Sequence, residues 1–165
     1  MAQSGQRQLA IEVSLQVNGE RWTGLVRHEE TLLELLRDQL QLTGTKRSCE
    51  SQVCGVCTVL VDGMAVSACT YLAFEASEMS VTTVEGLGNE QALDPLQDAF
   101  IRHQATQCGF CTAGMLMTAK ALLLESPDPS REEITAYLNG NMCRCGAYPA
   151  ILAAIQDAAG QAPSR

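Results

Sequence analysis

The sequence lacks the features that several common protein classes require. No apolar run approaches the roughly 20 residues needed to cross a bilayer, so a membrane span is not expected. The 11 Lys and Arg residues are outnumbered by 19 Asp and Glu residues, which gives a formal net charge of −8 at pH 7. The cationic residues are scattered apart from Lys46 and Arg47, whereas nucleic-acid binding requires clustered positive charge. Nucleic acid is therefore not an expected partner.

Signatures of catalysis by the chain itself are also missing. The sequence has no nucleophile elbow and no phosphate-binding loop, and its two histidines, His28 and His103, have no plausible nucleophile near them in sequence. We therefore expect no substrate chemistry on this chain alone. No signal-length apolar segment follows the N-terminal residues, so the expected location is cytoplasmic.

Cysteine is the informative residue among those present. Eight cysteines in 165 residues are about 5%, below the roughly 8–10% that marks a short secreted disulfide scaffold. In a reducing compartment such thiols are available to bind metal. They divide into two groups of four with none left over: Cys49, Cys54, Cys57 and Cys69, then Cys108, Cys111, Cys143 and Cys145.

The first half of the chain predicts a small sheet crossed by one helix. Apolar and polar side chains alternate before Asn18 and Gly19, a strong hairpin signal. Thr31 and Glu34 fit a capping box at the start of a leucine-rich helical face. The expected elements are strands over residues 9–17 and 21–26, a helix from 31 to about 43, a hairpin over 58–68 and a strand over 81–84.

From Asp94 onward the pattern becomes helical. Pro95 suits the first position of a helix, and Ser130 with Glu133 forms another capping box. Helices are expected near residues 95–103, 112–125 and 130–138 and from 149 onward. The sequence therefore predicts an α+β chain, with a β-grasp domain over residues 1–84 and an all-α four-helix-bundle domain over residues 85–165.

The first group of cysteines has a diagnostic spacing. Cys49-x4-Cys54-x2-Cys57 followed by Cys69 matches the plant-type pattern, in which a loop and a more distant thiolate hold a [2Fe–2S] cluster. Zinc is the alternative metal, but zinc sites usually combine Cys-x2-Cys units or cysteine with histidine. This group lacks that arrangement, so we predict a [2Fe–2S] cluster.

The second group is less diagnostic by spacing alone. Cys108-x2-Cys111 could be a thioredoxin-like redox pair or half of a zinc site, and Cys143-x1-Cys145 adds a second close pair. Both pairs directly precede predicted helices. Two ferric ions, two sulfides and four thiolates carry a net charge of −2, which helix N-termini stabilise through their dipoles and free N–H groups. A second cluster is therefore compatible with this position.

Four motifs in this order carry a family resemblance. They are Cys49-x4-Cys54-Gly-Val-Cys57-Thr-Val-Leu-Val-Asp-Gly63, Glu85-Gly-Leu87, Gln107-Cys-Gly-Phe-Cys-Thr112 and Gly140-Asn-Met-Cys-Arg-Cys-Gly146. Together they resemble the small iron–sulfur subunit of the molybdenum hydroxylases, the family of xanthine dehydrogenase, aldehyde oxidoreductase and carbon monoxide dehydrogenase. The similarity covers residues 9 to 158, nearly the whole chain.

The resemblance implies a ferredoxin-like domain with one [2Fe–2S] cluster and a helical domain with the other, nearer to the molybdenum. Substrate would be oxidised at a molybdenum–pterin centre on a large subunit, and electrons would pass through both clusters to FAD on a medium subunit or to another acceptor. The expected assembly is a dimer of heterotrimers. By position, Gln107 and Cys145 match the family residues that approach the pterin, and all eight cysteines match its cluster ligands.

The sequence also departs from the family pattern. Ser51 and Gln52 stand where the family commonly has glycine in the first ligand loop, and Val56 replaces a common alanine. Ala113 replaces a frequent proline, and Gly146 replaces a frequent threonine, which affects the local geometry of the second site. Two other hypotheses for the function remain beside the electron-transfer subunit: a free two-cluster ferredoxin-like carrier and a zinc-stabilised interaction module.

Overall fold

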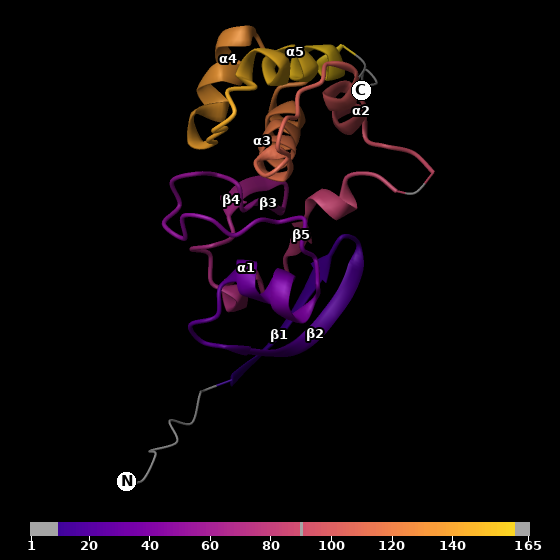
Figure 1. Cartoon of the computed structure of the whole chain (residues 1–165). Coiled ribbons are helices and arrows are strands. Elements are labelled where there is room, and N and C mark those ends of the chain that lie inside the picture. The colour runs from indigo at the N-terminus through magenta and orange to yellow at the C-terminus, as the bar shows by residue number, and fades with distance from the viewer. Residues whose placement is uncertain (1–9, 90, 161–165) are drawn as a thin grey trace.

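The computed structural model of the protein describes residues 10–89 and 91–160, which form two halves stacked one above the other (Figure 1). One half holds the sheet and helix α1, and the other holds helices α2 to α5. Residues 1–9, 90 and 161–165 of the two expected domains lie outside the described residues, and among them is Leu9, which was expected to begin the first strand. The combination of a mixed sheet and helices confirms the predicted α+β class.

Five strands form one mixed sheet in the order β2-β1-β5-β3-β4. Strand β5 lies at the centre, parallel to β1 and antiparallel to β3. It ends earlier than the expected 81–84 because the chain turns into the 3₁₀ helix η3 (Val84–Gly86). The strands are β1 (Ala10–Val17), β2 (Glu20–Arg27), β3 (Thr58–Val61), β4 (Met64–Ser67) and β5 (Ser80–Thr82).

Both predicted hairpins turn over two residues with positive φ angles. Asn18 and Gly19 have φ of 53° and 86°, and Asp62 and Gly63 have φ of 48° and 83°. Positive φ at both central residues is the turn geometry whose twist matches that of the flanking strands. Asn18 also links the first hairpin to the end of β5, because its Oδ1 accepts the Thr83 N–H at 2.9 Å.

The predicted first helix is shorter and wider than expected. Its capping box is present, with the Glu34 N–H donating to Thr31 Oγ1 at 3.2 Å. However, α1 (Leu32–Glu34) continues as the π-helix η1 (Leu35–Gln39), in which the Leu40 N–H donates to the Leu35 carbonyl at 3.1 Å. The leucine pattern predicts a buried helical face, and Leu32, Leu33, Leu35 and Leu36 are buried while Leu40 is partly buried, but the pattern does not specify the number of residues per turn.

The core of this half lies between the sheet and that helical segment. Val13, Leu15 and Val17 alternate along β1 and pack in one buried cluster with the leucines of α1 and η1. Burying a Val or Leu side chain contributes about 1.5–3 kcal/mol, so this cluster supplies most of the apolar stabilisation near the first cysteine group. Cys57 and Cys69 belong to the same cluster.

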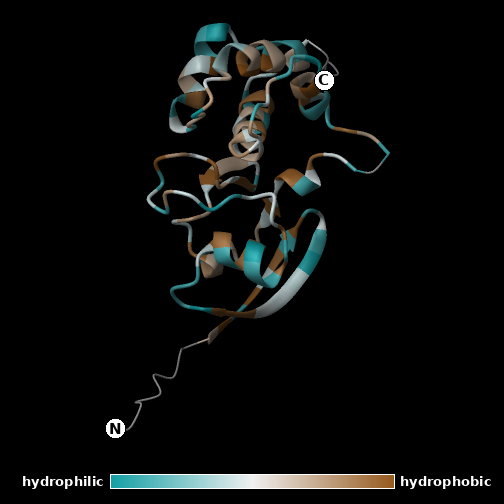
Figure 2. Cartoon of the chain, in the orientation of Figure 1, coloured by the Kyte–Doolittle hydropathy of each residue, from teal (hydrophilic) through white to brown (hydrophobic). Residues whose placement is uncertain are grey.

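Four α-helices make up the other half. Helix α3 is its centre, since residues from Gly114 to Ala119 are all buried and α2, α4 and α5 surround it (Figures 1 and 2). Asp94 caps α2 and also accepts from Lys120 Nζ on α3 at 2.6 Å. The helices are α2 (Pro95–Arg102), α3 (Thr112–Glu125), α4 (Arg131–Tyr137) and α5 (Tyr148–Ala159), with the 3₁₀ helix η4 (Leu138–Gly140) after α4.

Helix α3 also joins the two halves. Leu60 on β3 packs with Met117 and Ala121 on α3 in a small buried cluster. Nearer its start, α3 touches the first cysteine loop so closely that a Cβ atom on Gly114 would collide with the Gly55 carbonyl oxygen and lie 2.9 Å from the Val56 Cα. Only glycine allows this approach.

Replacing Gly114 by alanine should therefore weaken the contact between α3 and the first cysteine loop. We expect Gly114→Ala to lower the free energy of unfolding by about 1–3 kcal/mol, because either the loop or the helix must move. The measurement is the thermal unfolding midpoint of the iron-loaded protein. Gly140→Ala is the matched control, since a Cβ at Gly140 meets nothing within 4 Å. Equal midpoints for both variants would show that the close contact does not constrain the protein.

Candidate metal centres

The first cysteine group gathers at one end of the sheet. Cys49 and Cys54 lie on the loop before β3, Cys57 directly precedes β3, and Cys69 follows β4. The thiols meet in two pairs, since Cys49 shares a hydrogen bond with Cys54 and Cys57 shares one with Cys69. Cys49 is exposed, whereas the other three thiols are buried. The structure thus brings together the four residues that the spacing indicated.

The backbone of this loop adopts left-handed conformations at Glu50, Gln52 and Gly55, with φ of 53°, 60° and 65°. Alternating left-handed residues turn successive N–H groups toward one point and form a concave anion site. The N–H groups of Ser51, Val53 and Cys54 donate to the Cys49 sulfur and lower the pKa of its thiol to about 6. The loop therefore favours a thiolate at Cys49.

Burial has the opposite effect deeper in the same group. It raises the pKa of the Cys57 thiol to about 12, and the charge of Cys54 adds to this increase. A thiol in such a position ionises only when a cation compensates its charge. An anionic ligand at Cys57 is therefore consistent with bound metal.

The second group lies where two helices begin. Cys111 is the N-cap residue of α3, and Cys143 and Cys145 precede α5. These thiols also pair, Cys108 with Cys145 and Cys111 with Cys143, so each pair joins one turn to the other. Cys108 and Cys145 are exposed, and Cys143 is buried.

Backbone N–H groups and burial again act on the thiols in opposite directions. The Phe110 N–H lowers the pKa of Cys108, and burial raises the pKa of Cys111 to about 12. Burial would also raise the pKa of Cys143, but the Ala147 N–H, the Cys111 side chain and the N–H groups of Cys145 and Gly146 together outweigh it and lower that pKa. The start of α5 thus presents N–H groups to sulfur, as expected for a helix N-terminus.

The arrangement of the thiols suits a two-iron cluster. Across residues 10–89 and 91–160, no group of three or more His, Cys, Asp or Glu side chains could hold one metal ion. Each group instead forms two pairs of thiols, which suits two irons that share four thiolate ligands. The N–H groups directed at sulfur suit the net negative charge of such a cluster.

Two hydrogen bonds join the two groups directly. The Met142 N–H donates to the Cys54 carbonyl at 2.9 Å, and Asn141 Nδ2 donates to the Gly55 carbonyl at 3.0 Å. Asn141 is itself held by Thr118, whose Oγ1 donates to Asn141 Oδ1 at 3.0 Å. Residues next to ligands of one group are thus bonded to a ligand loop of the other.

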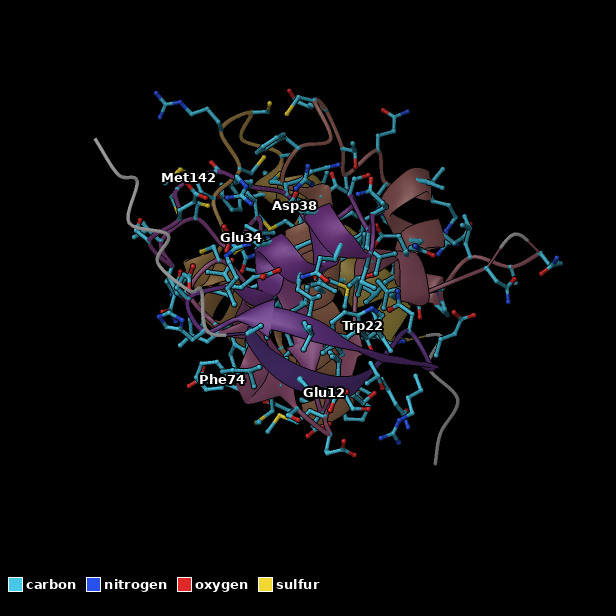
Figure 3. All side chains as sticks on the ribbon, turned by 90° about the horizontal axis from the view of Figure 1, so that it is seen from below. Glu12, Trp22, Glu34, Asp38, Phe74 and Met142 are labelled. Atoms are coloured by element: carbon cyan, nitrogen blue, oxygen red, sulfur yellow. The ribbon has the colours of Figure 1, made fainter. Side chains whose placement is uncertain are left out.

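A small cavity of about 130 Å³ lies beside this connection. It is lined by residues of both groups: Ser48, Cys54, Val56, Cys108, Phe110, Cys111, Met142 and Arg144. The side chain of Met142 is half exposed and lies at the rim of the molecule (Figure 3). Both cysteine groups therefore border the same small cavity.

Gln107, the proposed pterin contact, directly precedes Cys108 of the second group. It is exposed, and its Nε2 donates to the Cys145 carbonyl at 3.3 Å. Sequence reasoning did not identify the bonding roles of Thr118, Asn141 and Tyr148. Asn141 falls within the quoted motif Gly140–Gly146 and Tyr148 follows it by two residues, but Thr118 is an ordinary helix residue in sequence and only its burial marks it.

The pKa values predict the order in which the iron-free protein reacts with iodoacetamide. At pH 7 a thiol with a pKa of about 6 is mostly thiolate, so exposed Cys49 should be alkylated first. Cys57 and Cys111, with pKa values of about 12, should react last, which makes each the internal control for its group. Mass spectrometry of peptides after short labelling measures this order, and early labelling of Cys57 would contradict it.

Comparison with known proteins agrees with this geometry. Residues 15–85 match the family described as "2Fe-2S iron-sulfur cluster binding domain", and residues 83–156 match "[2Fe-2S] binding domain". The chain is 50% identical to the nicotine 6-hydroxylase small subunit of Paenarthrobacter nicotinovorans, over 92% of this chain and 91% of that subunit.

Solved structures give the same result. A chain of quinoline 2-oxidoreductase from Pseudomonas putida 86 matches with a TM-score of 0.89 and 46% identity, over 93% of this chain and 95% of that one. The aldehyde oxidoreductase from Desulfovibrio desulfuricans matches with a TM-score of 0.87 and 44% identity, over 91% of this chain but only 17% of that longer chain. This protein belongs to the small iron–sulfur subunits of the molybdenum hydroxylase family, which includes the xanthine dehydrogenases and aldehyde oxidoreductases.

Proposed function

We propose that this chain is the electron-transfer subunit of a heteromeric molybdenum hydroxylase. It receives electrons from a molybdenum–pterin centre on a large subunit and passes them to FAD on a medium subunit, or to another acceptor. A [2Fe–2S] cluster in each cysteine group would accept and release one electron at a time. The observation that carries the proposal is the direct bond between the groups, from the Met142 N–H to the Cys54 carbonyl.

The ligands are proposed to be the eight cysteines in their two groups. The second group faces outward through Cys108 and Cys145, with exposed Gln107 beside them, which suits contact with a large partner. We assign Gln107 and Cys145 to the pterin side because they match, by position, the family residues that approach the pterin; the two are also linked, since the Gln107 amide donates to the Cys145 carbonyl. The first group exposes Cys49, which suits exchange with the acceptor.

The chain's own residues hold the centres and bury part of each group. Burial of Cys57 and Cys69 in the core of the sheet half limits water at the first group. N–H groups directed at the sulfurs of Cys49 and Cys143 stabilise added negative charge, and hydrogen bonds to sulfur help to set a cluster's potential. No substrate chemistry is assigned to this chain.

The finer features of the assembly belong to the same proposal. We propose a ferredoxin-like β-grasp domain over residues 1–84 and a four-helix-bundle domain over 85–165, supported by the two family matches that meet at residues 83–85. We also propose a dimer of heterotrimers in the cytoplasm, where reducing conditions keep ligand thiols free. Across residues 10–89 and 91–160, no helix is long and apolar enough to cross a membrane.

Removing one ligand of the second group tests the relay. We expect Cys108→Ser in the assembled complex to abolish electron flow from molybdenum and to lower iron from about four to about two atoms per chain, because a hydroxyl is a poor substitute for a thiolate. The first cluster's electron paramagnetic resonance signal should remain. Thr106→Ser, two residues earlier, is the control. Unchanged turnover in Cys108→Ser would refute the relay.

The assignment of Gln107 has its own test. We expect Gln107→Ala to slow electron transfer between the molybdenum centre and the second cluster by about threefold to tenfold, the size of effect that one lost hydrogen bond produces. Rapid-mixing spectroscopy of the complex measures this rate. The control is Gln156→Ala, which removes another exposed glutamine, on α5, and should leave the rate unchanged. If both variants transfer electrons at the same rate, Gln107 has no role in this transfer.

A further inference from the structure

Tyr148, the first residue of α5, holds the backbone on both sides of Met142. Its hydroxyl oxygen accepts the Cys143 N–H at 2.8 Å, and its O–H donates to the Asn141 carbonyl at 3.0 Å. One phenol group therefore fixes two consecutive peptide groups of the second ligand turn. Neither bond belongs to regular secondary structure, so the hydroxyl serves this turn specifically.

The planarity of the peptide bond gives this contact a consequence. The Asn141 carbonyl and the Met142 N–H belong to the same peptide group, and in a planar trans peptide they point in opposite directions. Tyr148 holds the carbonyl end, and the Cys54 carbonyl accepts from the N–H end at 2.9 Å. The direction of the Met142 N–H is thus determined by the position of the Tyr148 hydroxyl.

These bonds form a continuous chain between the two cysteine groups. It runs from the Cys143 N–H to the Tyr148 hydroxyl, through the Asn141–Met142 peptide, to the Cys54 carbonyl. Hydrogen bonds in series polarise and strengthen one another. Both ends of the chain are residues whose thiols belong to the candidate centres.

The peptide needs such support because it lies near solvent. The Met142 side chain is 51% exposed, so water can compete for its N–H if the peptide rotates. The neighbouring link is protected differently, since the Asn141 side chain is 7% exposed overall and is held by Thr118. The link through Met142 therefore depends on Tyr148.

We propose that Tyr148 is a positioning residue for electron transfer between the two clusters. It holds the Asn141–Met142 peptide so that the second ligand turn stays bonded to the first ligand loop. This role rests on the proposed relay. The two hydrogen bonds of the Tyr148 hydroxyl are observed independently of that relay. Tyr148 contacts neither substrate nor reacting atoms.

The test compares two tyrosine variants in the assembled complex. Tyr148→Phe keeps the ring and removes the hydroxyl, and Tyr137→Phe removes a hydroxyl that bonds Glu125, the last residue of α3, at 2.9 Å. We expect Tyr148→Phe to retain about four irons per chain but to slow electron transfer between the clusters about fivefold or more, as two lost hydrogen bonds imply. The magnetic interaction between the two reduced clusters should also change. Tyr137→Phe should alter neither.

Wild-type rate and wild-type magnetic interaction in Tyr148→Phe would overturn the proposal. A second measurement uses the unaltered complex, because the variant could lose its iron. Hydrogen exchange of the peptide containing Met142 should be slow in the wild type, and exchange as fast as an exposed loop would also overturn the proposal. Failure of the relay itself differs from both outcomes, because the first cluster would then not be reduced by the second even in the wild type.

Discussion

Negative charge on sulfur is the constraint on which this structure depends. A chain of 165 residues with two [2Fe–2S]-binding domains must compensate the net negative charge of two clusters, and an unpaired charge away from water is costly. The protein meets this cost with backbone rather than with cationic side chains: N–H groups from the left-handed turns around Glu50 and Gln52 in one half, and from the start of α5 in the other. The sheet and the helices serve to hold those N–H groups in place.

The same requirement explains where the two halves touch. Ligand loops cannot be buried deeply in either core, because their carbonyl groups also need partners. The loops are therefore placed against each other, and the carbonyls of Cys54 and Gly55 accept from Met142 and Asn141. A junction that satisfies backbone groups thereby also brings the two centres together. The contacts that stabilise the junction are thus the ones that the proposed relay would use.

Local signals made much of the fold predictable from sequence. The helix over residues 112–125 is observed with the expected bounds, and Asn18 and Asp62 mark both hairpins, since caps, turns and prolines act over a few residues. The cysteine spacing also predicted which four thiols belong together. Which thiols pair within each group did not follow from spacing.

Features set by distant contacts were not predictable. Asn141 bonds the Gly55 carbonyl across 86 positions of sequence, and nothing local indicates that partner. Glu50 and Gln52 adopt left-handed angles that sequence would assign to glycine or asparagine, because the surrounding structure imposes them. The π-helical turn after Glu34 is likewise not indicated by the leucine pattern, and its residues Leu35 and Leu36 pack in one buried cluster with side chains of the sheet.

The glycine at position 114 has a consequence for the physics of tunnelling. It lies three residues after Cys111, so one turn of α3 carries a thiol of the second group at one end and rests on the first ligand loop at the other. A helical turn is a stiff spacer, and direct contact with the Gly55 backbone leaves no flexible side chain between. Because tunnelling rates fall exponentially with separation, such a spacer would shield the rate between clusters bound in the two groups from thermal fluctuation of the two halves.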